Sequence, residues 1–459
     1  MRTLKFNLIY FTIILALIFR IFYHFKFSNL NFHIDSATYL EIAYKILYLD
    51  FKSDREYYEA LRPPGYSLII VLSFFNQHLL VIVQTILSII GYILCFNLSY
   101  KITNNFLISY IILVLLLFDI NGVNYERTVQ TETISTFLNC LVVYLTYIAK
   151  TRNSNKLKIA ISLLIAFSVL VRPNLISNII LLFWLSKTFT ELLKLVFPTI
   201  IFIIFWSYIN YINTGYFIFT TLTYNLYFFF KSIDKEKLIK DLKIQTMADS
   251  VIVSLHGKPP AQIIFLLKDI LNVRVIDAYI TFNSFVTKQL MPKYKYRYIN
   301  SVISNFPLFF SMSKNQEACH NTPYKIKGKA FVYIDCNFNH ERCKIPQNAQ
   351  VLWKCYNSKE FLDQGSMFNK IWNIQGYIYN IITKLFLIII FIELLLRPIT
   401  KHIKEDDFIS IIVSYIIFSA FITVLSIAYL TSRYTFPFQP FIFMFVFYKS
   451  LKIFSIFKK

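Results

Sequence analysis

A polar, acidic and aromatic segment from Asn31 to Tyr66 carries the residues best suited to chemistry, and strongly apolar segments flank it. Asp35, Tyr39 and Ala43 are spaced four residues apart, so on a helix they share one face. Asp35 then lies at or near the start of that helix, where free N–H groups stabilise a carboxylate. A carboxylate held in this way is a candidate for a proton-accepting step.

Further ionisable residues border apolar segments, where charges are costly to bury and are read as functional by default. Besides Asp35 they are Arg62, Glu126, Arg127, Glu132, Arg172 and Arg433. The topology predicted from the basic loops between spans places all of them on the outer side of a membrane. Because arginine matches phosphate oxygens with a planar fork, a carboxylate among several arginines predicts proton transfer beside a phosphate group.

The composition indicates what must hold these residues. The chain has 459 residues, 56% of them hydrophobic and only 16% charged, with a mean hydropathy of +0.53. Apolar runs near the length of a bilayer crossing recur along it, so we predict an all-α polytopic membrane protein. The net charge of +22 would suit a nucleic-acid partner. We exclude that partner because Lys and Arg gather in short loops and at the C-terminus, as in inner-facing loops.

Hydropathy predicts about ten spans, with the N-terminus, the loop Lys150 to Lys158 and the C-terminus inside. The first apolar run begins like a signal peptide, but its length and the lack of a small-residue cleavage site predict a retained span. The expected spans are Leu4–Phe25, Leu79–Leu98, Phe106–Phe118, Thr131–Tyr147, Ile159–Val171, Leu175–Leu185, Leu195–Ile212, Tyr377–Leu396, Phe408–Leu430 and a last one ending near Tyr448.

Three regions follow from this pattern. Residues 1–212 form an N-terminal transmembrane module whose first outer loop, 26–78, carries Asp35, and residues 377–459 form the C-terminal transmembrane helices. Residues 213–376 form an outer hydrophilic loop domain of mixed α and short β structure. Within it, Ile263 to Ile280 is too charged to cross the membrane and predicts an amphipathic helix on its surface. The alternating run Ala330 to Ile334 predicts a strand.

The pattern Asp35-x-x-x-Tyr39-x-x-x-Ala43, followed by Arg62-Pro63-Pro64-Gly65-Tyr66 and a span, resembles the first outer loop of GT-C membrane glycosyltransferases. That family includes the protein O-mannosyltransferases and the aminoarabinose transferase that modifies lipid A. The resemblance covers the first 180 residues fairly well and the rest thinly. Supporting matches are Thr131-Glu132-Thr133, Val171-Arg172-Pro173 and Ser432-Arg433-Tyr434, which precedes a last span containing Pro437 and Pro440.

The resemblance implies an inverting transfer of a sugar from a polyprenyl-phosphate donor to a glycan, lipid or protein acceptor. The reaction would take place on the outer face of a bacterial plasma membrane. Asp35 would be the general base, and the donor phosphate would be bound by Arg62, Arg172, Arg433 and Tyr434. Tyr39, Tyr66, Arg127 and Glu132 would contact substrate or a metal. Relatives often carry a second acidic residue directly after the first, where this chain has Ser36, so the role of a divalent cation stays open.

Four cysteines fall in the predicted outer loop, namely Cys319, Cys336, Cys343 and Cys355. An outer compartment permits disulfides, and four cysteines allow three pairings, so we expect two disulfides of open connectivity. A zinc site of Cys319, His320, His340 and Cys343 is an alternative that lacks a recognised ligand spacing.

Plainer roles compete with these assignments. Asp35 could serve only as an N-cap, Glu132 could serve only the helix dipole, and the tyrosines could be interfacial aromatics. Arg172 and Arg433 could be snorkelling side chains. For the whole chain, the alternatives are a transporter or flippase of lipid-linked glycans, or a glycan polymerase. A transporter favours ionisable groups at the membrane midplane and repeated halves, whereas this chain has nearly charge-free spans and no internal repeat.

Overall fold

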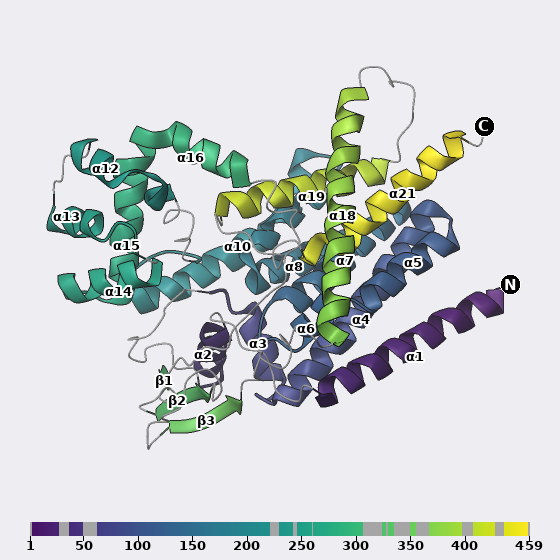
Figure 1. The fold of residues 1–459 in the computed structure, drawn as a ribbon, viewed down its shortest axis with the longest axis horizontal. Coiled ribbons are helices and arrows are strands. Elements are labelled where there is room, and N and C mark those ends of the chain that lie inside the picture. The colour runs from purple at the N-terminus through teal and green to yellow at the C-terminus, as the bar shows by residue number, and fades with distance from the viewer. Residues whose placement is uncertain are drawn as a thin grey trace.

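Helices dominate the computed structural model (Figure 1). It describes residues 2–26, 36–48, 62–220, 229–241, 246–258, 260–305, 324–326, 329–334, 349–354, 367–396, 407–426 and 436–457. Several residues singled out in the sequence lie outside the described residues: Asp35, Arg433, Tyr434, Cys319, His320, Cys336, His340, Cys343 and Cys355.

Five described helices are long and apolar enough to cross a membrane. They are α1 (Arg2–Lys26), α4 (Gln77–Thr103), α7 (Glu132–Arg152), α10 (Phe189–Thr214) and α18 (Met367–Leu396). A sixth span arises if α5 (Phe106–Leu117) and α6 (Ile120–Glu126), which meet at a bend of 51°, are counted as one. The chain is therefore a mainly helical, multi-pass membrane protein.

The described spans are fewer than the ten that hydropathy predicts, because several apolar runs form shorter helices. α8 (Asn155–Val171) has 17 residues, and at about 1.5 Å per residue it falls short of a hydrocarbon core of about 30 Å. The run that follows it forms η1 (Pro173–Asn178) and α9 (Ile179–Leu185). α5 matches the predicted span Phe106–Phe118 to within one residue, and α6 then starts where the Asp119 side chain accepts a hydrogen bond from the Asn121 N–H.

Five further helices belong to the bundle region but are not among the candidate spans within the described residues. They are α2 (Ser36–Tyr48), α3 (Gly65–Leu72), α19 (Asp407–Ser426), η5 (Phe436–Phe438) and α21 (Gln439–Phe457). α4 and α7 pack together at the centre, where a Cβ on Gly91 would lie 3.2 Å from the Phe137 Cα. Cys95 and Cys140 are buried free thiols in this core.

Residues 229–305 form a helical unit with a hydrophobic core of its own, built around Phe230, Phe282 and Leu290. The predicted single surface helix at Ile263 to Ile280 is wrong in one respect: two helices occupy it, because Asn272 adopts a left-handed φ of 51°. The helices of the unit are α12 (Lys235–Asp241), α13 (Met247–Ser254), α14 (Pro260–Leu271), α15 (Val275–Phe285), η2 (Val286–Leu290) and α16 (Met291–Asn305).

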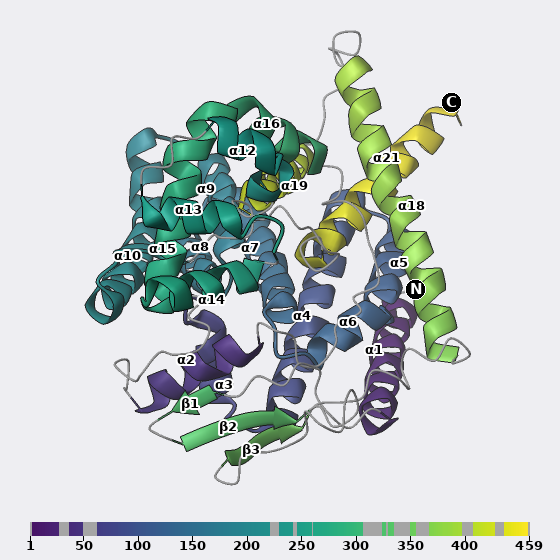
Figure 2. The same ribbon diagram turned by 60° about the vertical axis from the view of Figure 1, so that its left-hand side comes forward.

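Three short strands form a small sheet in the order β1-β2-β3, with β1 antiparallel and β3 parallel to β2. They are β1 (Tyr324–Ile326), β2 (Lys329–Ile334) and β3 (Ala349–Lys354). β1 contacts α2, and Figure 2 shows the sheet beside α2 and α3, apart from most of the helical unit. One mixed α/β domain spanning 213–376 is therefore not supported.

Candidate functional site

Arg172 and Glu132 form a buried ion pair at one end of the bundle. The Arg172 Nη1 donates to the Glu132 Oε1 at 3.1 Å, and the two residues are only 7% and 2% exposed. Glu132 is the first residue of α7, and Arg172 directly follows α8. The pair therefore ties the start of one helix to the end of the next, across forty residues of sequence.

Local sequence explains why Arg172 leaves the helix at this point. Its φ of −150° and ψ of 115° are extended, as expected for a residue that precedes a proline. Pro173 then starts η1 at a position where its missing N–H costs nothing. Arg172 therefore lies at the sharp turn between α8 and η1. Two residues later, the Asn174 amide donates to the Thr423 hydroxyl of α19 at 3.3 Å.

The Arg62-Pro63-Pro64-Gly65-Tyr66 segment packs against the same end of α8. A Cβ on Gly65 would lie 2.6 Å from both the Leu170 carbonyl carbon and the Val171 nitrogen. Real Cβ atoms essentially never approach backbone so closely, so only glycine lets α3 reach this position. The close packing places the start of α3 beside the residues that precede Arg172.

Two tyrosines and Arg62 meet next to this packing. The rings of Tyr39 and Tyr66 are edge to face, with centroids 5.0 Å apart. The Arg62 guanidinium lies 5.3 Å from the Tyr39 ring centroid, and its Nη1 donates to the Tyr39 hydroxyl at 3.3 Å. Burial, followed by the nearby Tyr39 and Glu132, raises the pKa of Tyr66 well above its ordinary value. Tyr66 therefore remains a neutral hydroxyl, which donates to the Gln84 Oε1 at 3.1 Å.

The first turn of α2 is fixed to the loop before α7. The Ser36 hydroxyl donates to the Val129 carbonyl at 2.9 Å, and the Ser67 hydroxyl donates to the Tyr39 carbonyl at 2.8 Å. Tyr39, Tyr66, Val129, Ile134 and Val171 belong to one hydrophobic cluster. Together these contacts unite α2, the Arg62 segment, the start of α7 and the end of α8. Asp35 is the covalent neighbour of Ser36.

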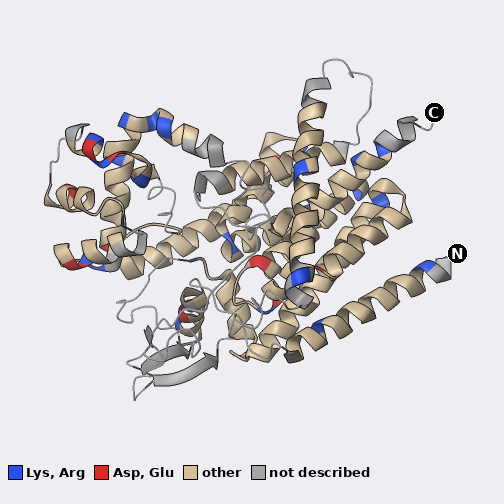
Figure 3. Ribbon diagram, viewed as in Figure 1, with Lys and Arg blue, Asp and Glu red and all other residues tan. Residues whose placement is uncertain are grey.

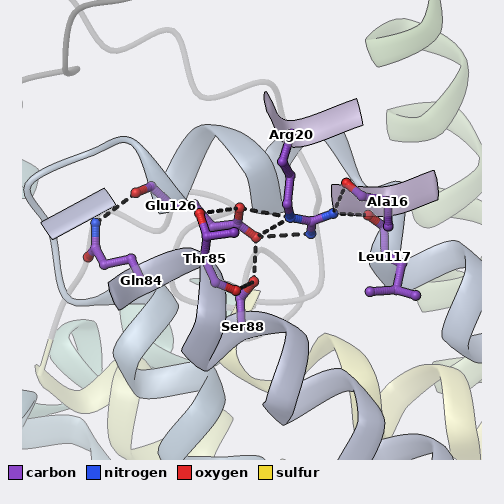
Figure 4. A network of polar contacts seen from close by, with 7 residues as sticks. All are labelled: Ala16, Arg20, Gln84, Thr85, Ser88, Leu117 and Glu126. Atoms are coloured by element: carbon purple, nitrogen blue, oxygen red, sulfur yellow. Dashed lines mark hydrogen bonds and ion pairs between the residues drawn. The ribbon is translucent and has the colours of Figure 1, made fainter. Parts of the chain in front are cut away.

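Glu126 belongs to a buried network (Figure 4) that Gln84 connects to Tyr66, because the Gln84 amide donates to the Glu126 carbonyl at 2.8 Å. The Arg20 Nε donates to both of its carboxylate oxygens, at 3.1 and 2.9 Å, and the Arg20 Nη2 donates to Oε1 at 2.9 Å. The Thr85 and Ser88 hydroxyls donate to the same carboxylate, and the Arg20 Nη1 donates to the Leu117 carbonyl at 2.6 Å. A carboxylate so fully paired serves to hold α1, α4 and α6 together.

Arg127 lies beside this network. Its guanidinium is 5.5 Å from the Tyr23 ring centroid, and the Tyr23 hydroxyl donates to the Asn124 Oδ1 at 2.8 Å. Close by, His24 and His78 approach at 3.4 Å between ring nitrogens. Among the described residues, the structure brings together the sequence candidates Arg62, Tyr39, Tyr66, Glu132 and Arg172. Arg127 lies next to Tyr23, beside the Glu126 network.

A buried polar seam, missed in the sequence, borders the Arg172–Glu132 pair. The Asn178 amide donates to the Asn139 Oδ1 at 3.2 Å, and the Asn139 amide donates to the Pro437 carbonyl at 3.2 Å. The only signal of it in the sequence is the density of small polar residues after Glu132, within an apolar run. We define the seam by Gln130, Thr133, Ser135, Asn139, Asn174 and Asn178, all at most 7% exposed.

Several polar atoms of the seam have no hydrogen-bond partner within the part of the chain that the structure describes. They are both side-chain polar atoms of Gln130, the Thr133 and Ser135 hydroxyls, and the Oδ1 atoms of Asn174 and Asn178. An unsatisfied buried polar group costs about 1–3 kcal/mol. Such a concentration of them beside one ion pair is unusual for a native core.

The described residues contain no group of three or more His, Cys, Asp or Glu side chains placed to hold a metal ion. Comparisons with protein families, curated proteins and solved structures gave no match to this chain. The chemistry of the site itself therefore carries the functional argument.

Proposed function

We propose that this protein is a membrane glycosyltransferase that moves a sugar from a polyprenyl-phosphate donor to an acceptor hydroxyl. The observation that carries the proposal is the convergence of α2, the Arg62 segment and the Arg172–Glu132 pair at one end of the bundle. These are the segments in which the resemblance to GT-C enzymes lies. In the proposed orientation this end faces outward across a bacterial plasma membrane.

Arg172 and Arg62 are suited to a lipid-linked phosphate. A buried guanidinium is partly desolvated, so its attraction for a phosphate oxygen is stronger than at an exposed surface. The Arg172 Nη1 donates to the Glu132 Oε1, and a guanidinium carries five N–H donors in a planar fork. In the proposed reaction Glu132 orients the fork while other N–H groups bind the departing phosphate.

Asp35 is the proposed base. It takes the proton of the acceptor hydroxyl as the acceptor oxygen forms a bond to the anomeric carbon. The bond from that carbon to the phosphate oxygen breaks, and the lipid phosphate leaves with the electron pair. Attack opposite to the leaving group inverts the anomeric centre. Proton removal by a positioned carboxylate contributes about 100- to 10,000-fold, and positive charge at the phosphate stabilises the charge that develops there.

The elements that flank Arg433 in sequence support its inclusion. α19 precedes it, and the Thr423 hydroxyl in that helix accepts from the Asn174 amide. η5 follows it, and the Pro437 carbonyl there accepts from the Asn139 amide of α7. Because Asn174 and Asn139 lie on the elements that carry Arg172 and Glu132, Arg433 is proposed as a third phosphate ligand, beside Arg172 and Arg62.

Transfer from labelled polyprenyl-phosphate sugars to water or an acceptor, by purified protein in nanodiscs, tests the proposal. Asp35→Asn should abolish turnover while the protein still expresses and folds. Arg172→Lys keeps the charge but loses the fork, and it should lower kcat about 100- to 1,000-fold. Arg152→Lys, at the exposed far end of α7, should retain full activity.

The measurement also separates the competing functions. Release or transfer of sugar supports the glycosyltransferase. Translocation of the intact lipid-linked sugar without cleavage, in proteoliposomes, would instead support a flippase. Full activity of Asp35→Asn would overturn the assignment of the base.

A further inference from the structure

The buried polar seam lies on facing elements. On α7, Ser135 and Asn139 follow Glu132 at spacings of three and seven residues, which places them on one helix face. On η1, Asn174 and Asn178 follow Arg172. Because Arg172 bonds Glu132 and Asn178 bonds Asn139, the seam extends directly from the ion pair into the bundle.

Gln130 lies two residues before Glu132 in the chain. Its side chain is 1% exposed, and neither its amide nitrogen nor its oxygen has a partner among the residues that the structure describes. A backbone hydrogen bond links Gln130 to the Tyr66 hydroxyl, so this residue also adjoins the Arg62 segment. Unpartnered amide and hydroxyl groups therefore lie before and within α7 and on η1, next to the pair that contains the proposed phosphate ligand Arg172.

We propose that the seam binds the sugar ring of the lipid-linked donor through its hydroxyl groups. This inference rests on the proposed function and deepens it by assigning the residues that recognise the sugar. Every unpartnered group in the seam is an uncharged amide or hydroxyl, and together they offer both donors and acceptors. Sugar hydroxyls need both kinds of partner at once.

Other parts of the donor match the seam less well. The lipid tail forms no hydrogen bonds and would leave the amides unsatisfied. The phosphate prefers a guanidinium to neutral amides, and Arg172 adjoins the seam. A site built for hydrogen bonds to hydroxyl groups also rejects ligands that lack them, because its own buried groups are then left unpaired. The seam thus distinguishes a glycosylated donor from the bare lipid phosphate.

Two substitutions remove unpartnered groups without removing any hydrogen bond within the described residues. Gln130→Met keeps similar volume, and Ser135→Ala deletes one hydroxyl. The matched control is Thr146→Val, because the buried Thr146 hydroxyl on the same helix is already satisfied by the Val142 carbonyl at 2.7 Å.

Binding of polyprenyl-phosphate mannose, polyprenyl-phosphate glucose and unglycosylated polyprenyl phosphate would be measured by thermal shift and titration on the full chain in nanodiscs. In the parent and in Thr146→Val, at least one glycosylated lipid should bind more tightly than the bare lipid. In Gln130→Met and Ser135→Ala this preference should fall by about tenfold or more, with binding of the bare lipid unchanged.

Retention of the sugar preference in both variants would overturn the inference. It would also be overturned if the variants had higher melting temperatures and unchanged ligand affinities, because the seam would then have only a structural role. The same outcomes leave the proposed function intact if the parent still transfers sugar. A parent that neither prefers glycosylated lipids nor transfers sugar would overturn both.

Discussion

Arg20 and Glu126 show how a charge can be kept inside the bundle for structural reasons. Glu126→Gln removes the negative partner of a guanidinium that is 4% exposed. Because an uncompensated buried charge remains, we expect the free energy of unfolding to fall by about 3–5 kcal/mol. Thermal unfolding in detergent, followed by intrinsic fluorescence, would measure this.

Two comparisons make the Glu126 prediction specific. Glu236→Gln, on an exposed turn of α12, should leave the melting temperature unchanged. The double variant Arg20→Met with Glu126→Met should recover much of the lost stability, because no unpaired charge is left. Equal melting temperatures for the parent and Glu126→Gln would show that the Arg20–Glu126 pair does not contribute to thermal stability.

Residue types in the sequence were enough to select much of the candidate site, but not its pairings. Glu132 and Arg172 stand out because each borders an apolar run. Their ion pair joins elements forty residues apart, and side-chain pairing at that range depends on packing that no local pattern encodes. Gln130 and Ser135 gave still less signal, since small polar residues are common at helix starts.

Gly65 controls how closely α3 approaches α8. Gly65→Ala would force a Cβ into the backbone at Leu170 and Val171, so α3 must move away from the end that carries Arg172. We expect the free energy of unfolding to fall by about 1–3 kcal/mol. The proposed transfer activity should fall even at temperatures where the variant is still folded, because the Arg62 segment moves with α3.

Gly376 provides a matched control for Gly65. A Cβ on Gly376, within α18, would meet nothing within 4 Å. Gly376→Ala should therefore be neutral or stabilise the helix by about 0.5–1 kcal/mol. If both variants melt alike, the packing of α3 against α8 tolerates a Cβ at position 65, contrary to the prediction.

Asp277 fastens α15 to the end of α10. It accepts from the Arg274 Nε at 2.8 Å, from the Arg274 Nη2 at 2.9 Å and from the Tyr216 hydroxyl at 3.0 Å. The Arg274 Nη2 also donates to the Thr214 carbonyl at 3.1 Å. The hydrogen bonds from Arg274, foremost, hold the pKa of Asp277 below its ordinary value of 3.8.

A lowered pKa gives this fastening a defined pH dependence. The contribution of Asp277 to docking is fully present above its unfolded pKa and is lost as the pH falls through the lower folded value. The protection of α15 and the end of α10 from hydrogen exchange, relative to the intrinsic rate at each pH, should therefore fall below pH 3.8. In Asp277→Asn, exchange there should already be faster at neutral pH and should lose this acid-dependent step. An unchanged acid response in the variant would assign the transition to another group.

At the level of elements, hydropathy located the apolar helices well and misjudged their ends. The helix α6, which Asp119 caps, was not predicted, and α14 and α15 replace one predicted surface helix because Asn272 turns the chain. In each case one residue with a local backbone preference interrupts a pattern that is continuous in hydrophobicity. Such breaks are invisible to a window average.

Across the whole molecule, the candidate site and the helical unit lie at the same end of the bundle. α8 and α10 start side by side, since the Lys158 Nζ lies 2.6 Å from the Glu191 Oε1, and both then run towards the end that carries Arg172. α10 ends at Thr214, where Arg274 of the helical unit binds. Figure 3 shows charged residues spaced along this unit, including α12 and α16, while the bundle helices are largely uncharged.

This arrangement yields a prediction about orientation. Lys293 is exposed on α16, in the helical unit, whereas Arg152 is exposed at the far end of α7 from Glu132. At about 1.5 Å per residue, the 21 residues of α7 separate its ends by about 30 Å, which is the thickness of the hydrocarbon core. Cysteines introduced at these two positions should therefore lie on opposite sides of the membrane.

A membrane-impermeant maleimide should label Lys293→Cys in intact cells and Arg152→Cys only after permeabilisation, with the parent chain measured in parallel to account for native cysteines. The opposite pattern would place the Arg172–Glu132 pair on the cytoplasmic side. In that case the proposed outward orientation of Ser36 and of the ion pair would be wrong, and with it the proposed reaction at the outer face. Labelling of both positions from outside would instead contradict the assignment of α7 as a complete span.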